Sequence, residues 1–296
     1  MSAVTATKPA RQGTGTPRRL VRRRRDPAKW AVLAAFIVLA AIMLVPFAIV
    51  LINAIKTPTE YANHGPLSLP HGVSTDGISK FWDQVDFGKK LWNSLLISGS
   101  VAVLAVLLAV LNAYALGLGK IKGRTWVLVL VLVCNTLPQE GLVYPLYYLA
   151  KKFGLYDTRL SVIIIFTVIQ SAFGTYLFSS VLSTFPKEII EAAQMDGASK
   201  WRVLWRVVVP ISRPTLTVMF VFFFIWTWNE FFIPMVMLVS NDNQTVPIAL
   251  GVTAGDKMMD ATLQSSASLL GILPAVVFFL IFQRTLSRGI TAGAVK

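Results

Sequence analysis

Two carboxylates, Glu140 and Glu230, interrupt long apolar stretches of the sequence. An ionisable side chain within a membrane-spanning segment is costly and is by default a functional candidate. Amide and indole side chains lie close to them in the sequence: Asn135, Gln139, Trp226, Trp228 and Asn229. Carboxylates and amides form hydrogen bonds with hydroxyl groups, and aromatic faces suit the C–H surfaces of a sugar. The pattern therefore predicts residues of a solute pathway that suits sugars.

The same residues have simpler explanations, which stay open at this point. Glu140 and Glu230 each lie about 14–16 residues from the inner end of an apolar segment. At ~1.5 Å per residue, both lie roughly 21–24 Å into a core of about 30 Å, in its outer third. Polar groups at that depth can extend to the interface, where Trp is also enriched. The two carboxylates could equally form hydrogen bonds between helices.

No cluster of residues indicates catalysis or nucleotide binding. The phosphate-binding pattern G-x-x-x-x-G-K-[ST] is absent, and the nearest string, at residues 117–125, has the wrong spacing. His64 and His71 have no supporting Cys or carboxylate cluster, which favours ordinary loop residues over metal ligands. Cys134 is the single cysteine and allows no internal disulfide. We therefore expect no enzyme activity, cofactor or metal in this chain.

A charged segment lies between two of the most apolar stretches. After Pro186, the string "KEIIEAAQM" contains strong helix formers, with Glu188 in the first turn. Asp196 and Gly197 then form a turn signal, because glycine readily adopts the left-handed conformation that ends helices. Within this helix, Ala192 and Ala193 have small side chains, which leave a bare ridge on the helix surface. Another protein surface could approach this ridge closely.

A second helix is predicted directly after this turn. Ser199 can cap it, and four apolar residues fall at i, i+3, i+4 and i+7 on one stripe: Trp201, Leu204, Trp205 and Val208. Pro210 closes the segment. An interfacial helix that only anchors a loop would explain this second helix. It does not explain the first helix with its bare ridge.

Composition indicates a membrane protein. Of 296 residues, 55% are hydrophobic and 14% are charged, with a mean hydropathy of +0.63; soluble domains are less apolar and more charged. Six segments are long and apolar enough to span a bilayer: residues 31–54, 91–118, 126–149, 160–182, 215–239 and 266–285. The third contains Pro138 and Pro145 as well as its polar residues. The predicted fold is all-α and polytopic, with six transmembrane helices.

The distribution of basic residues predicts the orientation. Twenty of the 28 Lys and Arg residues lie in residues 1–30, 119–125, 183–213 and 284–296. Basic residues concentrate on the cytoplasmic side, so both termini are predicted to be cytoplasmic in a cell (plasma) membrane. The net charge of +14 then reflects topology and contact with anionic lipid rather than nucleic-acid binding.

The charged segment resembles a known family. Glu191, Ala192, Ala193, Gly197 and Pro210 match the pattern E-A-A-x3-G-x9-I-x-L-P of ABC importer permeases. Val207 and Val209 stand in place of Ile and Leu. The resemblance implies that residues 184–213 are the coupling loop, which docks on a separate ATPase. Its docking residues would be Glu188, Glu191, Ala192, Ala193, Asp196, Gly197 and Pro210.

Other stretches are similar to the carbohydrate branch of this family: "WNSLLIS" (92–98), "WNEFFIP" (228–234), "QTVPIALG" (244–251) and "FQRTLSRGITAGAVK" (282–296). Within it, the chain looks like the shorter, MalG-like subunit of the maltose-type pair. This implies a type I ABC importer permease fold. The implied partners are a MalF-like second permease, an ATP-binding subunit dimer that uses ATP and Mg, and an extracytoplasmic sugar-binding protein.

Four regions follow: a disordered basic cytoplasmic tail (1–30), a first span with its outer loop (31–90), a core permease domain (91–286) and a cytoplasmic C-terminal tail (287–296). The expected function is that of a permease subunit in an ATP-driven carbohydrate importer of a bacterial cell membrane. One alternative is a secondary transporter driven by an ion gradient through Glu140 or Glu230, although no internal repeat is evident. The other is a membrane-bound enzyme or a non-catalytic scaffold.

Overall fold

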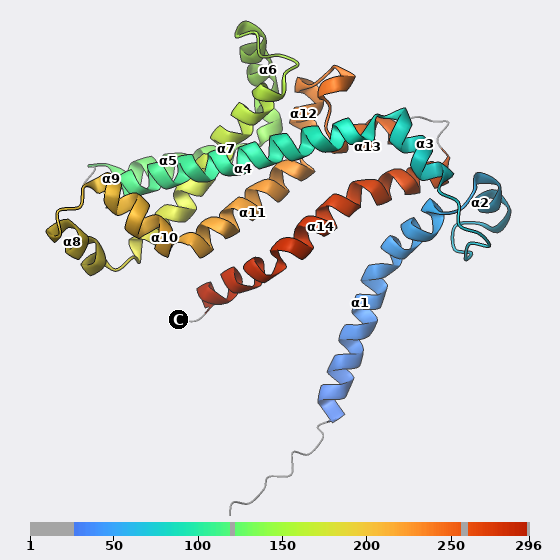
Figure 1. Cartoon of the computed structure of the whole chain (residues 1–296), viewed down its shortest axis with the longest axis horizontal. Helices are drawn as coiled ribbons and strands as arrows, with labels where there is room; N and C mark the ends of the chain where they lie inside the picture. Colours follow the sequence, from blue (N-terminus) through green and yellow to red (C-terminus); the bar gives the residue numbers. More distant parts are fainter. Residues whose placement is uncertain (1–26, 119–121, 256–259, 295–296) are drawn as a thin grey trace, which may run out of the picture. The chain divides into compact units, whose positions relative to one another are not determined.

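The computed structural model describes residues 27–118, 122–255 and 260–294, and in these residues every regular element is helical. The chain divides into two compact units, Met1–Pro46 and Phe47–Lys296. Figure 1 shows the helices in sequence order. The predicted tail at residues 1–30 lies mostly outside the described residues.

The helices follow one another with short connections. In chain order they are α1 (Pro27–Ala54), α2 (Pro58–His64), α3 (Asp76–Gln84), α4 (Phe87–Leu118), α5 (Arg124–Asn135), η1 (Gln139–Leu142), α6 (Val143–Lys152), α7 (Arg159–Ser183), α8 (Lys187–Met195), α9 (Lys200–Val203), η2 (Leu204–Val208), α10 (Val209–Ile211), α11 (Arg213–Asn229), α12 (Phe232–Met237), η3 (Asn241–Asn243), α13 (Val246–Gly255) and α14 (Ala261–Ala294).

Four helices among the described residues are long and apolar enough to cross a membrane: α1, α4, α7 and α14. Two bent pairs bring the number to six if each is one span. In the first pair, Arg124–Asn135 and Gln139–Lys152 meet at 90°. In the second, Lys200–Ile211 and Arg213–Asn229 meet at 78°. The prediction of six spans agrees with this count.

The structure corrects the shape of two predicted spans. The third, predicted over residues 126–149, ends as an α-helix at Asn135 and resumes at right angles after Pro138, which cannot donate a backbone hydrogen bond. The fifth, predicted over residues 215–239, ends at Asn229 and resumes at Phe232. Both candidate carboxylates therefore lie at or directly after a helix break rather than within a continuous helix.

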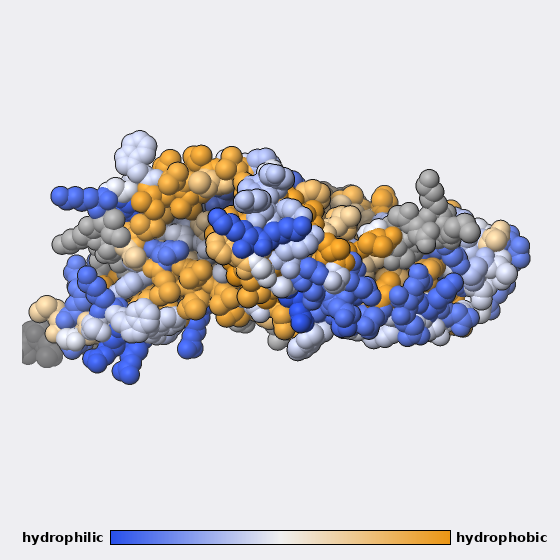
Figure 2. Space-filling view, turned by 90° about the horizontal axis from the view of Figure 1, so that it is seen from above, coloured by the Kyte–Doolittle hydropathy of each residue, from blue (hydrophilic) through white to orange (hydrophobic). Residues whose placement is uncertain are grey.

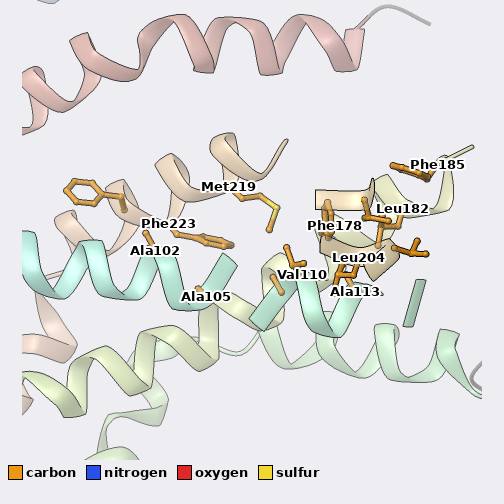
Figure 3. Packing of buried hydrophobic residues seen from close by; sticks show 14 of the residues in the cluster. Ala102, Ala105, Val110, Ala113, Phe178, Leu182, Phe185, Leu204, Met219 and Phe223 are labelled. Carbon is orange, nitrogen blue, oxygen red and sulfur yellow. The ribbon is translucent and has the colours of Figure 1, made fainter. Parts of the chain in front are cut away.

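Small residues allow the central helices to pack closely. α4 packs against α7 and α11, and α11 packs against α14. α4 places a row of fully buried alanines at this contact: Ala102, Ala105, Ala109 and Ala113. A Cβ on Gly174 of α7 would lie 2.8 Å from the Ala109 Cβ and 2.9 Å from the Phe223 ring. Small residues of this kind let membrane helices approach each other, and Figure 3 shows the resulting core.

Large apolar side chains also cover much of the surface of the second unit. Examples at helix surfaces are Leu104 and Leu108 of α4, Val168 of α7, and Val277 and Ile281 of α14. Figure 2 shows apolar residues gathered in broad patches on the face that it displays. Hydrocarbon tails suit such a surface, as expected of a membrane protein.

Candidate coupling helix and solute pathway

α8 is a short helix that ends in a hydrogen-bonded turn at Gly197. Gly197 lies just beyond it at φ +78°, in the left-handed region. Its N–H donates to the Gln194 carbonyl (3.0 Å), and the Ala198 N–H donates to the Ala193 carbonyl (3.0 Å). This pair of bonds is the Schellman motif, which satisfies carbonyls at a helix end. The predicted turn at residues 196–197 is therefore confirmed.

α8 begins without a side-chain cap. Pro186 occupies the N-cap position, and Glu188 lies in the first turn as predicted. The hydroxyls of Ser183 and Thr184 instead donate to carbonyls in the last turn of α7. Among the α8 residues whose side chains the structure describes, Ile190 alone is buried, in the core cluster with Phe185.

The remaining face of α8 is open. The side chains of Glu188, Glu191, Ala192 and Asp196 are exposed, and Ala193 is half-buried. Met195 is 88% exposed, the largest exposed fraction among the large apolar side chains of the described residues. In Figure 1, α8 lies at one end of the second unit, beside α9, with which it is in contact. Of the two alanines of the predicted ridge, Ala192 is exposed, and Ala193 packs in part against the core.

The second helix of the segment contains a π-helical turn that the sequence did not reveal. Ser199 caps it as predicted, and its hydroxyl accepts from the Arg202 N–H (3.3 Å). Farther along, the Val209 N–H donates to the Leu204 carbonyl, five residues back. Pro210 has no N–H and its ring crowds the carbonyl four residues earlier, so a widened turn just before it relieves both problems.

The buried face of this second helix differs in part from the predicted stripe. Val203, Leu204 and Val208 are buried, whereas Trp201, predicted to lie on the apolar stripe, is 62% exposed and contacts the Trp205 ring. The buried residues belong to the same cluster as Ala113 of α4 and Leu182 of α7. The Tyr114 hydroxyl of α4 also donates to the Lys200 carbonyl (2.9 Å). The segment is thus packed into the bundle rather than loosely anchored beside it.

The two helix breaks resemble each other. Asn135 ends α5 and donates its amide to the Val131 carbonyl (2.9 Å); Asn229 ends α11 and donates to the Ile225 carbonyl (2.7 Å). A glutamate follows each break. Glu140 is exposed in the first turn of η1, and Gln139 beside it is half-buried.

Glu230 is half-buried directly after the break and before the start of α12, and it lies near enough to Glu140 for an electrostatic interaction between the two carboxylates. The similar depth predicted from the sequence is consistent with this proximity. Each carboxylate also lies at the N-terminal end of a helix, where negative charge is favourable.

The tryptophans of the predicted pathway have different surroundings. Trp226 is half-buried and contacts the rings of Phe173 and Phe222. Trp228 is 5% exposed, and its ring stacks on Phe224 within the core. In this structure Trp228 therefore contributes to packing. Asn229 is exposed next to the break.

The sequence analysis missed a polar network near the N-terminal end of α4. Asn93 is fully buried; it donates to the carbonyls of Asp242 (2.8 Å) and Gln244 (2.9 Å) and accepts from Arg159 (3.1 Å). Ser94 accepts from the Val246 N–H (2.9 Å). The quoted stretches at residues 92–98 and 244–251 are therefore hydrogen-bonded to each other. A polar pair at the start of an apolar segment was the available signal.

The two histidines, His64 at the end of α2 and His71 in the connection to α3, lie together. Their ring centroids are 4.7 Å apart, and the Nδ1 of His71 lies 3.1 Å from Glu60. Within the described ranges, no group of three or more His, Cys, Asp or Glu residues is placed to hold a metal ion.

Comparison with known families identifies the chain. Residues 105–292 match the family described as "Binding-protein-dependent transport system inner membrane component". The chain belongs to this family. As a member of this inner-membrane family with several apolar helices, it is a multi-pass membrane protein and a transporter subunit rather than an enzyme.

Relatives in the family are similar over most of the chain. The inner membrane ABC transporter permease protein YcjP of Escherichia coli is 30% identical, over 89% of this chain and 94% of its own length. The melibiose/raffinose/stachyose import permease protein MelC of Bacillus subtilis is 27% identical, over 88% and 94%. The diacetylchitobiose uptake system permease protein NgcG of Streptomyces coelicolor is 26% identical, over 89% and 87%.

A solved structure shares the fold. A chain of a bacterial ABC transporter that imports the acidic polysaccharide alginate is 21% identical and superimposes with a TM-score of 0.75. The match covers 88% of this chain and 97% of that one. The all-α type I permease fold predicted for this binding-protein-dependent permease is therefore confirmed.

Proposed function

We propose that this chain is a permease subunit of an ATP-driven carbohydrate importer and forms half of the translocation pathway. The observation that carries the proposal is α8, a largely exposed helix that ends in a hydrogen-bonded turn and continues into a second helix packed against the bundle. Because the sequence has no phosphate-binding loop, the energy of ATP enters through contact with another subunit.

The coupling loop works as a lever in this proposal. Its docking residues are Glu188, Glu191, Ala192, Ala193, Asp196, Gly197 and Pro210. The first six lie on α8 or at its end, and Pro210 lies where the second helix turns by 78° into α11. Burial of Val203, Leu204 and Val208 ties this helix to α4 and α7. Displacement of α8 by a nucleotide-driven partner is thereby transmitted to the spans and selects between two states.

The solute pathway lies along the two helix breaks. Hydrogen-bonding and aromatic groups there come from Asn135, Gln139, Glu140, Trp226, Asn229 and Glu230, whereas Trp228, also predicted for the pathway, is buried in the core. Helix breaks at membrane depth are tolerated where backbone groups line a cavity or contact protein. Carboxylate and amide side chains at the breaks suit a solute rich in hydroxyls. The sugar-import names of relatives such as MelC and NgcG support the same class of solute.

The partners follow from this assignment. They are a second, MalF-like permease, a dimer of ATP-binding subunits that hold ATP and Mg, and an extracytoplasmic sugar-binding protein. A related alginate transporter has been solved in complex with a pentasaccharide-bound periplasmic protein. Both termini lie on the cytoplasmic side of a bacterial cell membrane, because the basic residues concentrate there.

Purification of the assembled complex in mild detergent, through a tag on this chain, tests the proposal. We expect a second permease and an ATP-binding subunit to co-purify. Glu191→Lys should remove the ATP-binding subunit from the complex and abolish ATP-dependent uptake while the second permease stays bound. Recovery of the ATP-binding subunit in normal amount with Glu191→Lys would contradict docking through α8.

The ion-driven alternative makes a different prediction. If Glu140 or Glu230 transferred protons, uptake into membrane vesicles would continue without ATP and would collapse when an uncoupler is added. The ATP-driven importer requires the opposite result, and the family match favours it.

A further inference from the structure

Lys90 is a fully buried lysine near the N-terminal end of α4. Its ammonium donates to the backbone carbonyl of Asn241 and to its side-chain oxygen, the latter at 2.7 Å. A buried ammonium is costly unless polar partners replace water around it. Three residues farther along α4, Asn93 holds the carbonyls of Asp242 and Gln244. The N-terminal end of α4 is thus hydrogen-bonded to the segment that follows α12, residues 238–244.

Asp157, in the connection between α6 and α7, also forms hydrogen bonds with this segment and with the last residue of α12. Its N–H donates to the Met237 carbonyl (3.0 Å), and its carboxylate accepts from the N–H (2.9 Å) and the hydroxyl of Ser240. Its own carbonyl accepts from the Asn243 amide (2.6 Å). The backbone of Asp157 has φ +58°, which non-glycine residues seldom adopt. The four hydrogen bonds hold it there.

Only α12 and Phe231 separate Glu230 from this hydrogen-bonded segment. α12, a six-residue helix with Ile233, Pro234 and Met237 buried, begins two residues after Glu230 and ends where this segment starts. On the other side of the break, the Gln170 amide of α7 donates to the Thr227 hydroxyl (2.8 Å), three residues before Glu230. Because α12 is short and packed, a displacement of the segment after it also displaces the residues before it. Glu230 therefore lies between the hydrogen bond at Thr227 and the hydrogen bonds of the segment after α12.

We propose that Lys90, Asn93 and Asp157 form an outer clamp that acts through α12 to position Glu230 at the break in span five. This inference rests on the proposed function, in which Glu230 lies on the solute pathway. Stability alone does not require such a cluster, because apolar residues of similar volume often replace buried ionic groups at no cost. Three polar side chains from two elements converge here on one short segment.

Adjacent lysines provide a matched pair of variants. Lys89→Met and Lys90→Met remove the same charge one residue apart. Lys89 is 43% exposed and pairs with the exposed Asp242 (2.6 Å), whereas Lys90 is buried. Lys90→Met releases Asn241, and Lys89→Met breaks only a surface ion pair, which contributes little.

The experiment measures access to position 230 in the assembled complex in lipid nanodiscs. Glu230→Cys supplies the thiol, and Cys134→Ser removes the natural one. Labelling by a membrane-impermeant maleimide is followed without nucleotide and with ATP and vanadate. We expect Lys90→Met to accelerate labelling about tenfold, the change that corresponds to loss of hydrogen bonds to a charged group. It should also abolish the difference between the two nucleotide states, whereas Lys89→Met should change neither.

Equal labelling in Lys90→Met and Lys89→Met would overturn the clamp. If Lys90→Met is not recovered from the membrane, Asp157→Asn, which keeps the side-chain shape, decides the question by the same criteria. A different result would count against the proposed function alone. If the Glu230→Cys thiol labels equally in both nucleotide states with the clamp intact, its pathway role fails, while the labelling rate still reports the clamp.

Discussion

Replacement of Gly197 by valine tests whether the end of α8 must keep its shape for docking. A Cβ on Gly197 would meet no described atom within 4 Å, so backbone strain rather than crowding opposes a side chain there. A non-glycine residue in the left-handed region costs about 1–2 kcal/mol, and a β-branched residue is a stronger outlier. The strain is relieved if φ becomes negative, which breaks the two hydrogen bonds that end α8.

The expected loss follows from this cost. A penalty of about 1–2 kcal/mol changes an equilibrium by a factor of about 5–30. Because most of α8 is exposed, the change affects the end of this helix rather than the stability of the bundle. We therefore expect Gly197→Val to reduce the ATP-binding subunit recovered with the complex at least about fivefold. The amount of this chain in the membrane should stay the same.

Gly154 provides the matched control. It has φ +66°, and its Cβ would likewise meet no described atom within 4 Å. It ends α6 with the same pair of bonds, from the Gly154 N–H to the Lys151 carbonyl (3.1 Å) and from the Leu155 N–H to the Ala150 carbonyl (2.8 Å). Gly154→Val should leave recovery of the ATP-binding subunit unchanged. Equal recovery with both variants, whether normal or reduced, would refute the reasoning.

Two further predictions concern packing and pH. Gly174→Ala should lower the thermal midpoint of the purified complex, because its Cβ would lie 2.9 Å from the Phe223 ring and overpacking costs about 1–3 kcal/mol; Gly99→Ala, in open space within α4, should raise it slightly. The hydroxyl of Ser240 holds the pKa of Asp157 below its usual 3.8, so this carboxyl contributes stability above that value, which is lost as the pH falls through the lowered pKa. The thermal midpoint of the purified complex, measured between about pH 5 and pH 2, should fall as this contribution is lost. Asp157→Asn should make the thermal midpoint depend less on pH over this range. The same pH dependence in Asp157→Asn and in the unchanged protein would contradict the role of the hydrogen bond.

Local patterns predicted the coupling segment well. The helix after Pro186, the turn at Gly197 and the cap at Ser199 depend on hydrogen bonds between residues no more than five apart. Such bonds form wherever the local residue types allow them. The apolar stripe of the second helix was partly wrong: Leu204 and Val208 are buried as predicted, but Trp201 is exposed and Val203 is buried instead.

The candidate pathway was predictable only in outline. Carboxylates within apolar stretches identified Glu140 and Glu230, and counting residues predicted a similar depth for the two. The sequence did not show that a helix ends beside each of them, nor that Trp228 turns into the core. Propensity alone does not decide these features, because neighbouring helices determine where a break can be satisfied.

By itself, the sequence determined the membrane class, six apolar segments, the predicted orientation and the helix–turn–helix of the coupling loop. These depend on composition and on local spacing, which any folded arrangement of the chain retains. Only the tertiary structure decided that Asn93 holds Asp242, that Asp157 holds Ser240 and that Glu230 lies near Glu140. The residues of these pairs are separated by more than eighty positions. The packing of α4, α7 and α11 brings such distant positions together, and no local pattern encodes that packing.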